Sequence, residues 1–312
     1  MNLGNQTMVK EFFLTGFSQS LQTRIILFIL FLILYVLTIF GNCFLIFTVF
    51  TSPQIHTPMY YFLCNLSFLD LCYSSNSLPK MLIDVFSKRR RISIIDCLTQ
   101  MHIGLFLGGT ECILLAVMAY DRYIAICFPL YYTIIMSWRV CHCITLFMWA
   151  GSFILSTAPT MARPLVFCND NHIDHFACEI LVLLALACGD LSFYKIAIVI
   201  ISFFTLLSPF IFIIVSYICI IVSILHIRSV DGRSKAFSTC ASHLTVVLMF
   251  YGTSITMYMG HTKRFSSNLK YISLIYGVVT PVLNPMIYSL RNNEVKQAFQ
   301  KVFTKYVTKH TV

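Results

Sequence analysis

The sequence predicts an all-α fold, a bundle of seven helices that spans a membrane and ends in a short amphipathic helix. Composition, a series of long apolar runs and the short connections between most of them predict it. Of the 312 residues, 58% are hydrophobic and 11% are charged, whereas a soluble domain carries about 25% charged residues. Most of the surface is therefore expected to face lipid.

Seven apolar segments are each long enough to cross a bilayer, which takes roughly 20 residues. We expect each to be helical, because backbone groups in lipid find no water as a partner. Their approximate bounds are 25–50, 58–86, 97–127, 140–162, 194–225, 236–260 and 269–290. Since no internal repeat is seen, we treat residues 1–312 as one domain, and an inverted-repeat transporter is disfavoured.

Three segments lie outside the predicted spans. The N-terminal segment 1–24 lacks a charged start followed by an apolar core, so we expect no cleavable signal peptide. The loop 163–191 is long for a compact bundle, and such loops are usually functional. In the tail 291–312, residues 294–307 alternate lysines with apolar residues at helical spacing, which is typical of an interfacial helix.

The orientation depends on features other than charge bias. Lysine and arginine divide almost evenly between the two sides, because the basic run 88–91 opposes the usual rule. Asn5 begins a glycosylation sequon, and four cysteines lie in loops or at helix ends on the same side. These are Cys97, Cys168, Cys178 and Cys188. We therefore expect the N-terminus outside the cell and the C-terminus in the cytoplasm; the chemistry alone leaves three disulfide pairings open.

The net charge of +10 does not indicate nucleic-acid binding. The basic residues are scattered through short loops and form no basic face on a soluble element. We interpret them as anchors of helix ends at the lipid surface, and we expect the bilayer, not nucleic acid, as their partner.

Two carboxylates lie within predicted spans, Asp70 in the second and Glu111 in the third. Charges at this depth are costly and are functional candidates by default. They could form a site for a sodium ion or a proton together with Asn42, Ser67 or Asn284. Alternatively, one or both are simply protonated, because burial disfavours the charged form. We expect no other cofactor.

The cytoplasmic ends of the third and seventh spans carry a candidate switch. Asp121 and Arg122 end the third span, where an arginine can pair with its neighbour at rest and be released when helices part. In the seventh span, Pro281 and Pro285 each remove a helix hydrogen bond. Asn284 lies between them and can satisfy a freed carbonyl, with Tyr288 one turn further along.

Several motifs together resemble one known family. They include MAYDRYIAIC at 118–127, KAFSTCASHL at 235–244 and PVLNPMIYSLRN at 281–292, with shorter matches at 41–42, 55–60, 65–70 and 216–217. The chain resembles a tetrapod-type (class II) olfactory receptor of the rhodopsin-like G-protein-coupled receptor family. The resemblance runs from end to end of the chain, and Tyr131, where His or Arg is more usual, is one departure from it.

The resemblance implies a receptor, not an enzyme, in the plasma membrane, which raises cyclic AMP through a heterotrimeric G protein of the stimulatory olfactory type. It implies that Cys97 bonds Cys178, that Cys168 bonds Cys188, and that Asp70 and Glu111 are the family's acidic pair near a sodium-type site. The coupling and activation residues it implies are Asp121, Arg122, Tyr123, Tyr217, Lys235, Ser238, His243, Asn284, Pro285 and Tyr288.

Helical spacing predicts a ligand cavity between the outer halves of the third, fifth, sixth and seventh spans. The candidate lining residues are His102, Leu105, Phe106, Gly109, Ile201, Ser202, Thr205, Tyr251, Ser254, Ile255, Tyr258 and Tyr276. Any one of them could instead pack between helices. The set contains no acid to hold an amine and no guanidinium, so it predicts a small, volatile, mostly apolar odorant with one hydrogen-bonding group, oriented by Tyr258 or Ser202.

Other functions remain open alternatives. A transporter or channel would need a polar path, for which only Asp70 and Glu111 supply charge. We find no Ser/His pair or HExxH motif on a span, which disfavours an intramembrane enzyme. His172 and His175 beside Asp174 could bind Zn or Cu weakly. A receptor of the same fold that acts outside the nose is also compatible with the sequence.

Overall fold

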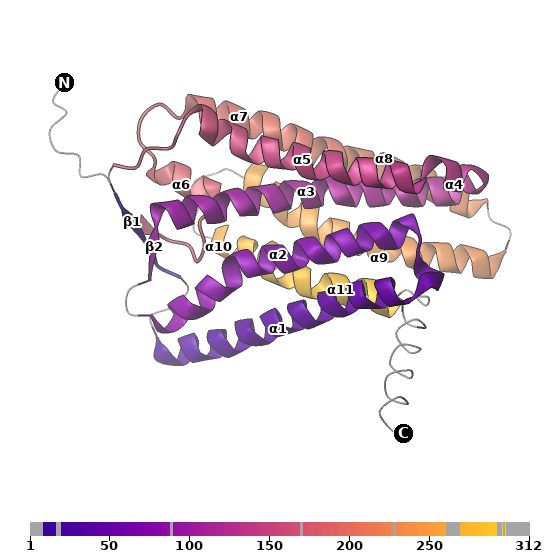
Figure 1. Ribbon diagram of the computed structural model, residues 1–312, viewed down its shortest axis with the longest axis horizontal. Coiled ribbons are helices and arrows are strands. Elements are labelled where there is room, and N and C mark those ends of the chain that lie inside the picture. Colours follow the sequence, from indigo (N-terminus) through magenta and orange to yellow (C-terminus); the bar gives the residue numbers. More distant parts are fainter. Residues whose placement is uncertain are drawn as a thin grey trace.

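The structure is a computed structural model that describes residues 9–16, 20–87, 90–168, 171–226, 229–259, 269–291, 295 and 297. Long helices run side by side along the molecule (Figure 1). Asn5 and, apart from two residues, the expected interfacial helix at 294–307 lie outside the described residues.

The described residues form seven long helical spans, which confirms the predicted fold class. They are α1 (Leu21–Thr51), α2 (Pro58–Phe86), α3 (Ile94–Cys127), α5 (Trp138–Ala162), a fifth span of α7 (Ser192–Ser202), η3 (Phe203–Leu207) and α8 (Ser208–Leu225), then α9 (Val230–Met259), and a seventh span of α10 (Leu269–Leu274), η5 (Ile275–Val279) and α11 (Thr280–Arg291). Short helices η1 (Pro53–Ile55), η2 (Pro129–Tyr131), α4 (Tyr132–Ile135) and α6 (Ile180–Leu186) lie in the connections.

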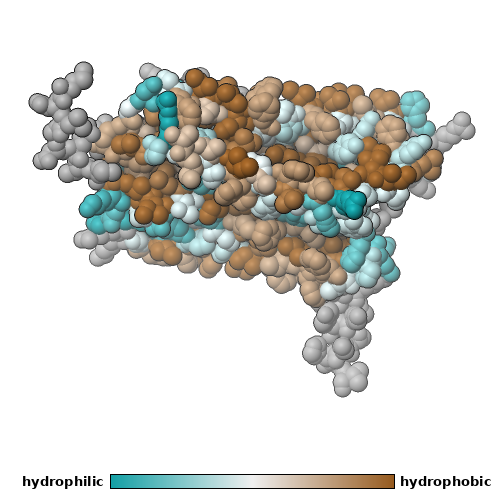
Figure 2. Space-filling view, turned by 45° about the horizontal axis from the view of Figure 1, so that its top comes forward, coloured by the Kyte–Doolittle hydropathy of each residue, from teal (hydrophilic) through white to brown (hydrophobic). Residues whose placement is uncertain are grey.

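Six of these spans are long and apolar enough to cross a membrane by length and composition. The further one, α2, has the length but carries more polar residues, among them buried Asp70 and Asp84. Large apolar side chains also cover the outside, such as Phe147 at 76% exposure and Val199 at 65%, and Figure 2 shows broad hydrophobic areas along the flank. A helix that is apolar all round belongs in lipid, so the chain is a multi-pass membrane protein.

Two spans contain a short π-helical segment just before a proline. In the fifth span η3 precedes Pro209, and in the seventh η5 precedes Pro281. Each segment adds a residue to one turn, which rotates the helix on either side of it, and such π-bulges are frequent at functional sites. The hydroxyl of Thr280 donates to the carbonyl of Ile275, five residues back, at 3.1 Å.

A three-stranded sheet, which the sequence analysis did not predict, covers one end of the bundle. Its order is β2 (Arg91–Ser93), β1 (Glu11–Leu14), β3 (His172–Ile173); β1 pairs antiparallel with β2 and parallel with β3. Phe12 of β1 packs edge-on against Phe167, with ring centroids 5.1 Å apart. We call this end, which also holds α6, the strand end, and the opposite end the α4 end (Figure 1).

Candidate functional site

A cavity lies inside the bundle towards the strand end. The space between its lining side chains, including the part that opens to solvent, is about 1000 Å³. Residues of α2, α3, α5, α6, the fifth span, α9 and η5 line it. The cavity therefore lies where the predicted third, fifth, sixth and seventh spans meet, with the fourth span as an additional wall.

Glycines of α3 open this cavity. Gly104, Gly108 and Gly109 all line it, and a Cβ added at Gly108 would meet nothing within 4 Å. A glycine inside a helix costs up to about 1 kcal/mol relative to alanine. The absence of side chains here leaves room in the middle of an otherwise close-packed bundle.

Eight of the twelve residues expected at the cavity line it. They are Leu105, Gly109, Ile201, Ser202, Thr205, Ser254, Tyr258 and Tyr276. Ligand binding by these residues remains a prediction, because their position at the cavity wall does not show contact with a ligand.

The other four residues expected at the cavity lie elsewhere, because the helices are rotated relative to the face that was assumed. His102 bonds the Ser156 carbonyl at 3.2 Å, and the ring of Phe106 packs on Trp149 and Phe153. Both therefore face α5.

On α9, Tyr251 donates to the Cys112 carbonyl at 2.7 Å and stacks on Phe210. Ile255 packs against the main apolar core. Neither side chain is part of the cavity lining.

α5 contributes a wall of the cavity that was not predicted from the sequence. Ser152, Ser156 and Thr160 line the cavity, and they recur every four residues on a helix that is otherwise mostly apolar. That spacing places them on one face. A polar stripe on an apolar span was the available signal, and it was not used.

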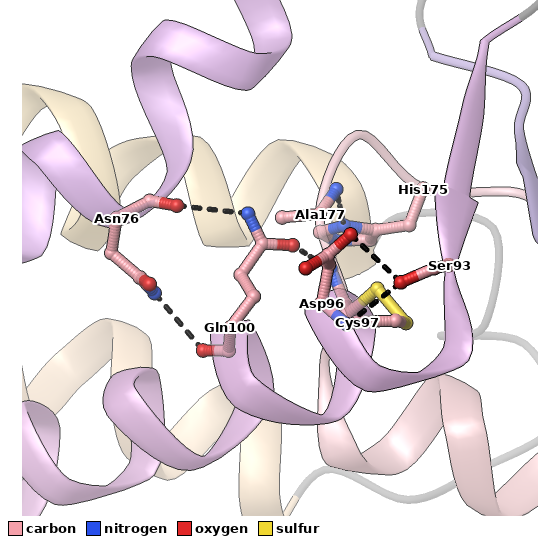
Figure 3. Close-up of a disulfide and its surroundings, with 8 residues drawn as sticks. Asn76, Ser93, Asp96, Cys97, Gln100, His175 and Ala177 are labelled. Atoms are coloured by element: carbon pink, nitrogen blue, oxygen red, sulfur yellow. Dashed lines mark hydrogen bonds between the residues drawn. A yellow bond between two sulfur atoms is a disulfide. The ribbon is translucent and has the colours of Figure 1, made fainter.

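The loop between α5 and α7 is held over the cavity by covalent and hydrogen bonds. Disulfides join Cys97 to Cys178 and Cys168 to Cys188, the pairing implied by the resemblance. Figure 3 shows the first of these beside Gln100, whose side-chain oxygen accepts from the Cys178 amide at 2.9 Å.

Gln100 is itself fixed to a neighbouring helix. Its Nε2 donates to the Asn76 carbonyl at 2.9 Å, and Asn76 Nδ2 donates to the Gln100 carbonyl at 3.0 Å. The two reciprocal bonds join α2 to α3 directly under the loop (Figure 3). The disulfide and the Gln100 bond therefore tie the loop residues around Cys178 to α3, which is in turn bonded to α2.

His172 and His175, considered above as metal ligands, take different partners. The ring of His172 stacks on Phe13 of β1, whereas His175 is buried, accepts from the Ala177 amide at 3.1 Å and bonds Ser273 at 3.2 Å. Burial lowers the pKa of His175 to about 4. Among the described residues there is no group of three or more His, Cys, Asp or Glu that could hold a metal ion.

Glu179 is a residue of the site that the sequence analysis did not find. It follows Cys178, lies beside a second, smaller cavity of about 360 Å³, and accepts a hydrogen bond from the Tyr276 hydroxyl. Burial raises the pKa of its carboxyl to about 7. The available signal was its position next to a cysteine expected to be tied to the start of the third span.

Asp70 and Glu111 lie together in the middle of the bundle. Asp70 accepts from Asn284 Nδ2 through both carboxylate oxygens, at 3.1 and 3.0 Å. Glu111 is near enough to interact electrostatically with it. The buried oxygens Glu111 Oε1, Asn284 Oδ1 and Asn42 Oδ1 have no hydrogen-bond partner among the described residues, so they fit a site that would accept a cation or a proton.

The carbonyl freed by Pro285 is satisfied by a different residue from the one expected. Pro285 has no N–H for the carbonyl of Pro281, four residues earlier. Asn42 Nδ2 of α1 donates to that carbonyl at 3.0 Å, while Asn284 bonds Asp70. Asn284 therefore does not satisfy this carbonyl, because α1 presents the amide of Asn42 to it and Asn284 faces the Asp70 carboxylate.

Towards the α4 end, Arg122 is buried among polar groups. It is 4% exposed and is near enough to interact electrostatically with Tyr217, His243 and Tyr288. Tyr217 and His243 are hydrogen-bonded at 2.8 Å, with their rings stacked. The structure thus gathers four of the expected activation residues from α3, α8, α9 and α11.

Asp121 takes part in a contact between α3 and α4. Its carboxylate accepts from the Tyr132 hydroxyl at 2.8 Å. Burial raises the pKa of Tyr132, and the negative charge of Asp121 raises it further. This hydroxyl therefore remains a donor at neutral pH.

The remaining expected activation residues are less constrained. Tyr123 packs edge-on against Phe128, and Ser238 is exposed on α9. The backbone of Lys235 lies in α9, but its side chain is outside the described residues.

The chain is similar to olfactory receptors over nearly its whole length. A family model described as "Olfactory receptor" matches residues 31–306. Olfactory receptor 13H1 of Homo sapiens is 48% identical over 306 residues, which is 98% of this chain and 99% of that protein. Olfactory receptor 5G29 of Mus musculus is 47% identical over 303 residues, 96% of each chain. Olfactory receptor-like protein OLF3 of Canis lupus familiaris is 46% identical over 308 residues, 97% and 96% of the two chains.

Proposed function

We propose, from the premise that this chain belongs to the olfactory receptor family, that it binds a small, mostly apolar, volatile ligand in the strand-end cavity. Binding would activate an olfactory-type stimulatory G protein at the α4 end and so raise cyclic AMP. Members of this family are receptors and not enzymes. We further propose that the strand end is extracellular and the C-terminus cytoplasmic, in the plasma membrane.

The cavity is the observation that carries this proposal. The surface of its walls is mainly apolar, with hydroxyls such as those of Ser202, Ser254 and Tyr258 as its polar groups. Such a site suits a ligand with one hydrogen-bonding group, and a molecule of about 10 heavy atoms can bind only modestly. If Tyr258→Phe and Ser202→Ala both leave the odorant response unchanged, neither residue orients the polar atom.

The position of Arg122 supports transmission to a G protein. The cavity and the Arg122 cluster lie at opposite halves of the same spans, α3, α9 and the seventh. A ligand that binds better when the α4 end is open would shift a pre-existing equilibrium towards that state. The ligand thus acts at a distance from the coupling surface without touching it.

Asp70 and Glu111 support a second part of the proposal, a sodium ion or a proton held between the two ends. Asp70 with the unpartnered oxygens of Glu111 and Asn284 would hold it. Such a cation would supply the positive charge that two neighbouring buried carboxylates lack. We expect Asp70→Asn to abolish any dependence of the response on sodium, and a dependence that persists would contradict this site.

A panel of odorants tested against cyclic-AMP output in transfected cells examines the function directly. We expect at least one small apolar odorant to give a response, and Arg122→Ala to abolish it while surface expression is largely retained. Normal signalling by Arg122→Ala would contradict the mechanism. Ion flux in proteoliposomes would instead favour a transporter. The cell assay applies equally to a receptor of this fold that acts outside the nose.

A further inference from the structure

The carboxylate of Glu179 does not cap the helix that follows it in its own loop. It stands at the position before α6, where an acidic side chain commonly caps the helix. Here the side chain makes no cap hydrogen bond and instead accepts from the Tyr276 hydroxyl of η5. The residue is half-buried and lines a cavity, so its open side faces the interior of the receptor.

Tyrosines surround this carboxylate. Tyr73 and Tyr276 line the small cavity with Glu179, and their rings meet edge-on with centroids 5.6 Å apart. Tyr258 of α9 is near enough to interact with the Glu179 charge. Tyr73, Tyr276 and Gly104 line both cavities, so the small cavity that Glu179 lines adjoins the large one.

Glu179 has no cationic partner among the described residues. Lys270 is bonded to Asp174 at 3.0 Å, and Arg91 to Glu11 at 3.0 Å. His175 is the nearest titratable loop residue in sequence, and it stays neutral near pH 7 because burial lowers its pKa to about 4. Lys270 and Arg91 are therefore engaged with other carboxylates and not with Glu179.

We propose that this receptor recognises protonated amine odorants, with the ammonium group held by Glu179 and the faces of Tyr73, Tyr258 and Tyr276, and the hydrocarbon part in the large cavity. A carboxylate gives an ammonium its strongest hydrogen bonds, and aromatic rings attract a cation through their negative faces. Because the partner carboxylate is already desolvated, an ammonium supplies the missing charge. This inference rests on the proposed function only in using its ligand cavity.

A matched pair of ligands tests the charge separately from the shape. N,N-dimethylcyclohexylamine and isopropylcyclohexane differ in the nitrogen that carries the proton and have nearly the same outline. We would measure binding of each as thermal stabilisation of the purified full-length receptor, which needs no G protein, over pairs of increasing ring and chain size. We expect the amine of at least one pair to bind about tenfold or more tightly than its carbon isostere.

Variants assign the preference to one carboxylate. Glu179→Gln should reduce the ratio of amine to isostere affinity to near one, and Glu179→Asp should restore part of it. Asp174→Asn, an acidic residue of the same loop that pairs with Lys270 instead, should leave the ratio as it is. Using a ratio within each variant removes differences in folding or yield.

The outcomes separate this inference from the proposed function. Equal affinity for amine and isostere in every pair, no stabilisation by any amine, or an amine preference that survives Glu179→Gln would overturn the inference, even if neutral odorants raise cyclic AMP. Amine binding that depends on Glu179 but produces no cyclic AMP would support the inference and contradict the proposed coupling.

Discussion

The hydrogen bond from Asn42 to the Pro281 carbonyl gives a prediction with a defined magnitude. Asn42→Ala removes the donor that lies 3.0 Å from this carbonyl. Since Pro285 cannot donate to it, the carbonyl would be left buried without a partner, which costs about 1–3 kcal/mol. At about 2–4 °C per kcal/mol, the melting temperature of the purified receptor should fall by several degrees.

A second substitution tests the reason for this loss. Pro285→Ala restores a backbone N–H that can donate to Pro281 within α11, which makes the Asn42 amide redundant. The cost of Asn42→Ala should then fall by most of the same 1–3 kcal/mol. Packing of the Pro285 ring, whose Cγ lies 3.1 Å from a Cβ placed at Gly41, is lost in both arms of the cycle and cancels.

The matched control uses a proline with no connection to Asn42. Pro79 lies inside α2, so Asn42→Ala and Pro79→Ala should have additive effects on the melting temperature. If Asn42→Ala costs as much in the Pro285→Ala background as in the wild type, the carbonyl is not what Asn42 satisfies, and the reasoning fails.

Three further predictions concern the cavity and the α4 end. Gly108→Ala should change the affinity ratio between ligands that differ by one methylene by about tenfold or more, measured as thermal stabilisation over a homologous series. Gly252→Ala is the control and should leave this ratio unchanged. A Cβ at Gly252 also meets nothing within 4 Å, but this residue does not line the cavity. Amine potency should fall about eightfold from pH 7.4 to 6.0, because the Glu179 carboxyl has a pKa of about 7 and must be ionised to bind. The response to a carbon isostere should stay constant over the same range, and a fall in both responses would refute this. Tyr217→Phe should lower the melting temperature by the equivalent of about 1–3 kcal/mol, since it leaves buried His243 without its 2.8 Å partner, and an unchanged melting temperature would contradict that contact.

Hydropathy was sufficient to locate the spans. The predicted 58–86 coincides with α2, and the other ends agree to within six residues. It could not predict η3 or η5, because a π-turn adds one residue without changing composition. Nor could it predict β1, since the strand has four residues and its partners β2 and β3 lie far along the chain.

Helical spacing was enough to predict part of the cavity lining. Residues spaced along the third and fifth spans, such as Leu105 and Ser202, line the cavity, but spacing does not determine how a helix is rotated, so His102 points to α5. Choosing between Asn42 and Asn284 for the Pro281 carbonyl required knowing that α1 lies beside α11. Predicting Glu179 as a cavity residue required knowing where the loop between α5 and α7 folds back onto the bundle.

The parallel pairing of β1 with β3 has a consequence for the order of folding. Phe13 pairs with His172, which is synthesised 159 residues later (172 − 13). At about 5–20 residues per second, β1 waits roughly 8–32 s, during which α1, α2, α3 and α5 are completed. The strand end therefore closes only after four spans exist, and until then its apolar residues, Phe12 among them, are available to chaperones or to other chains.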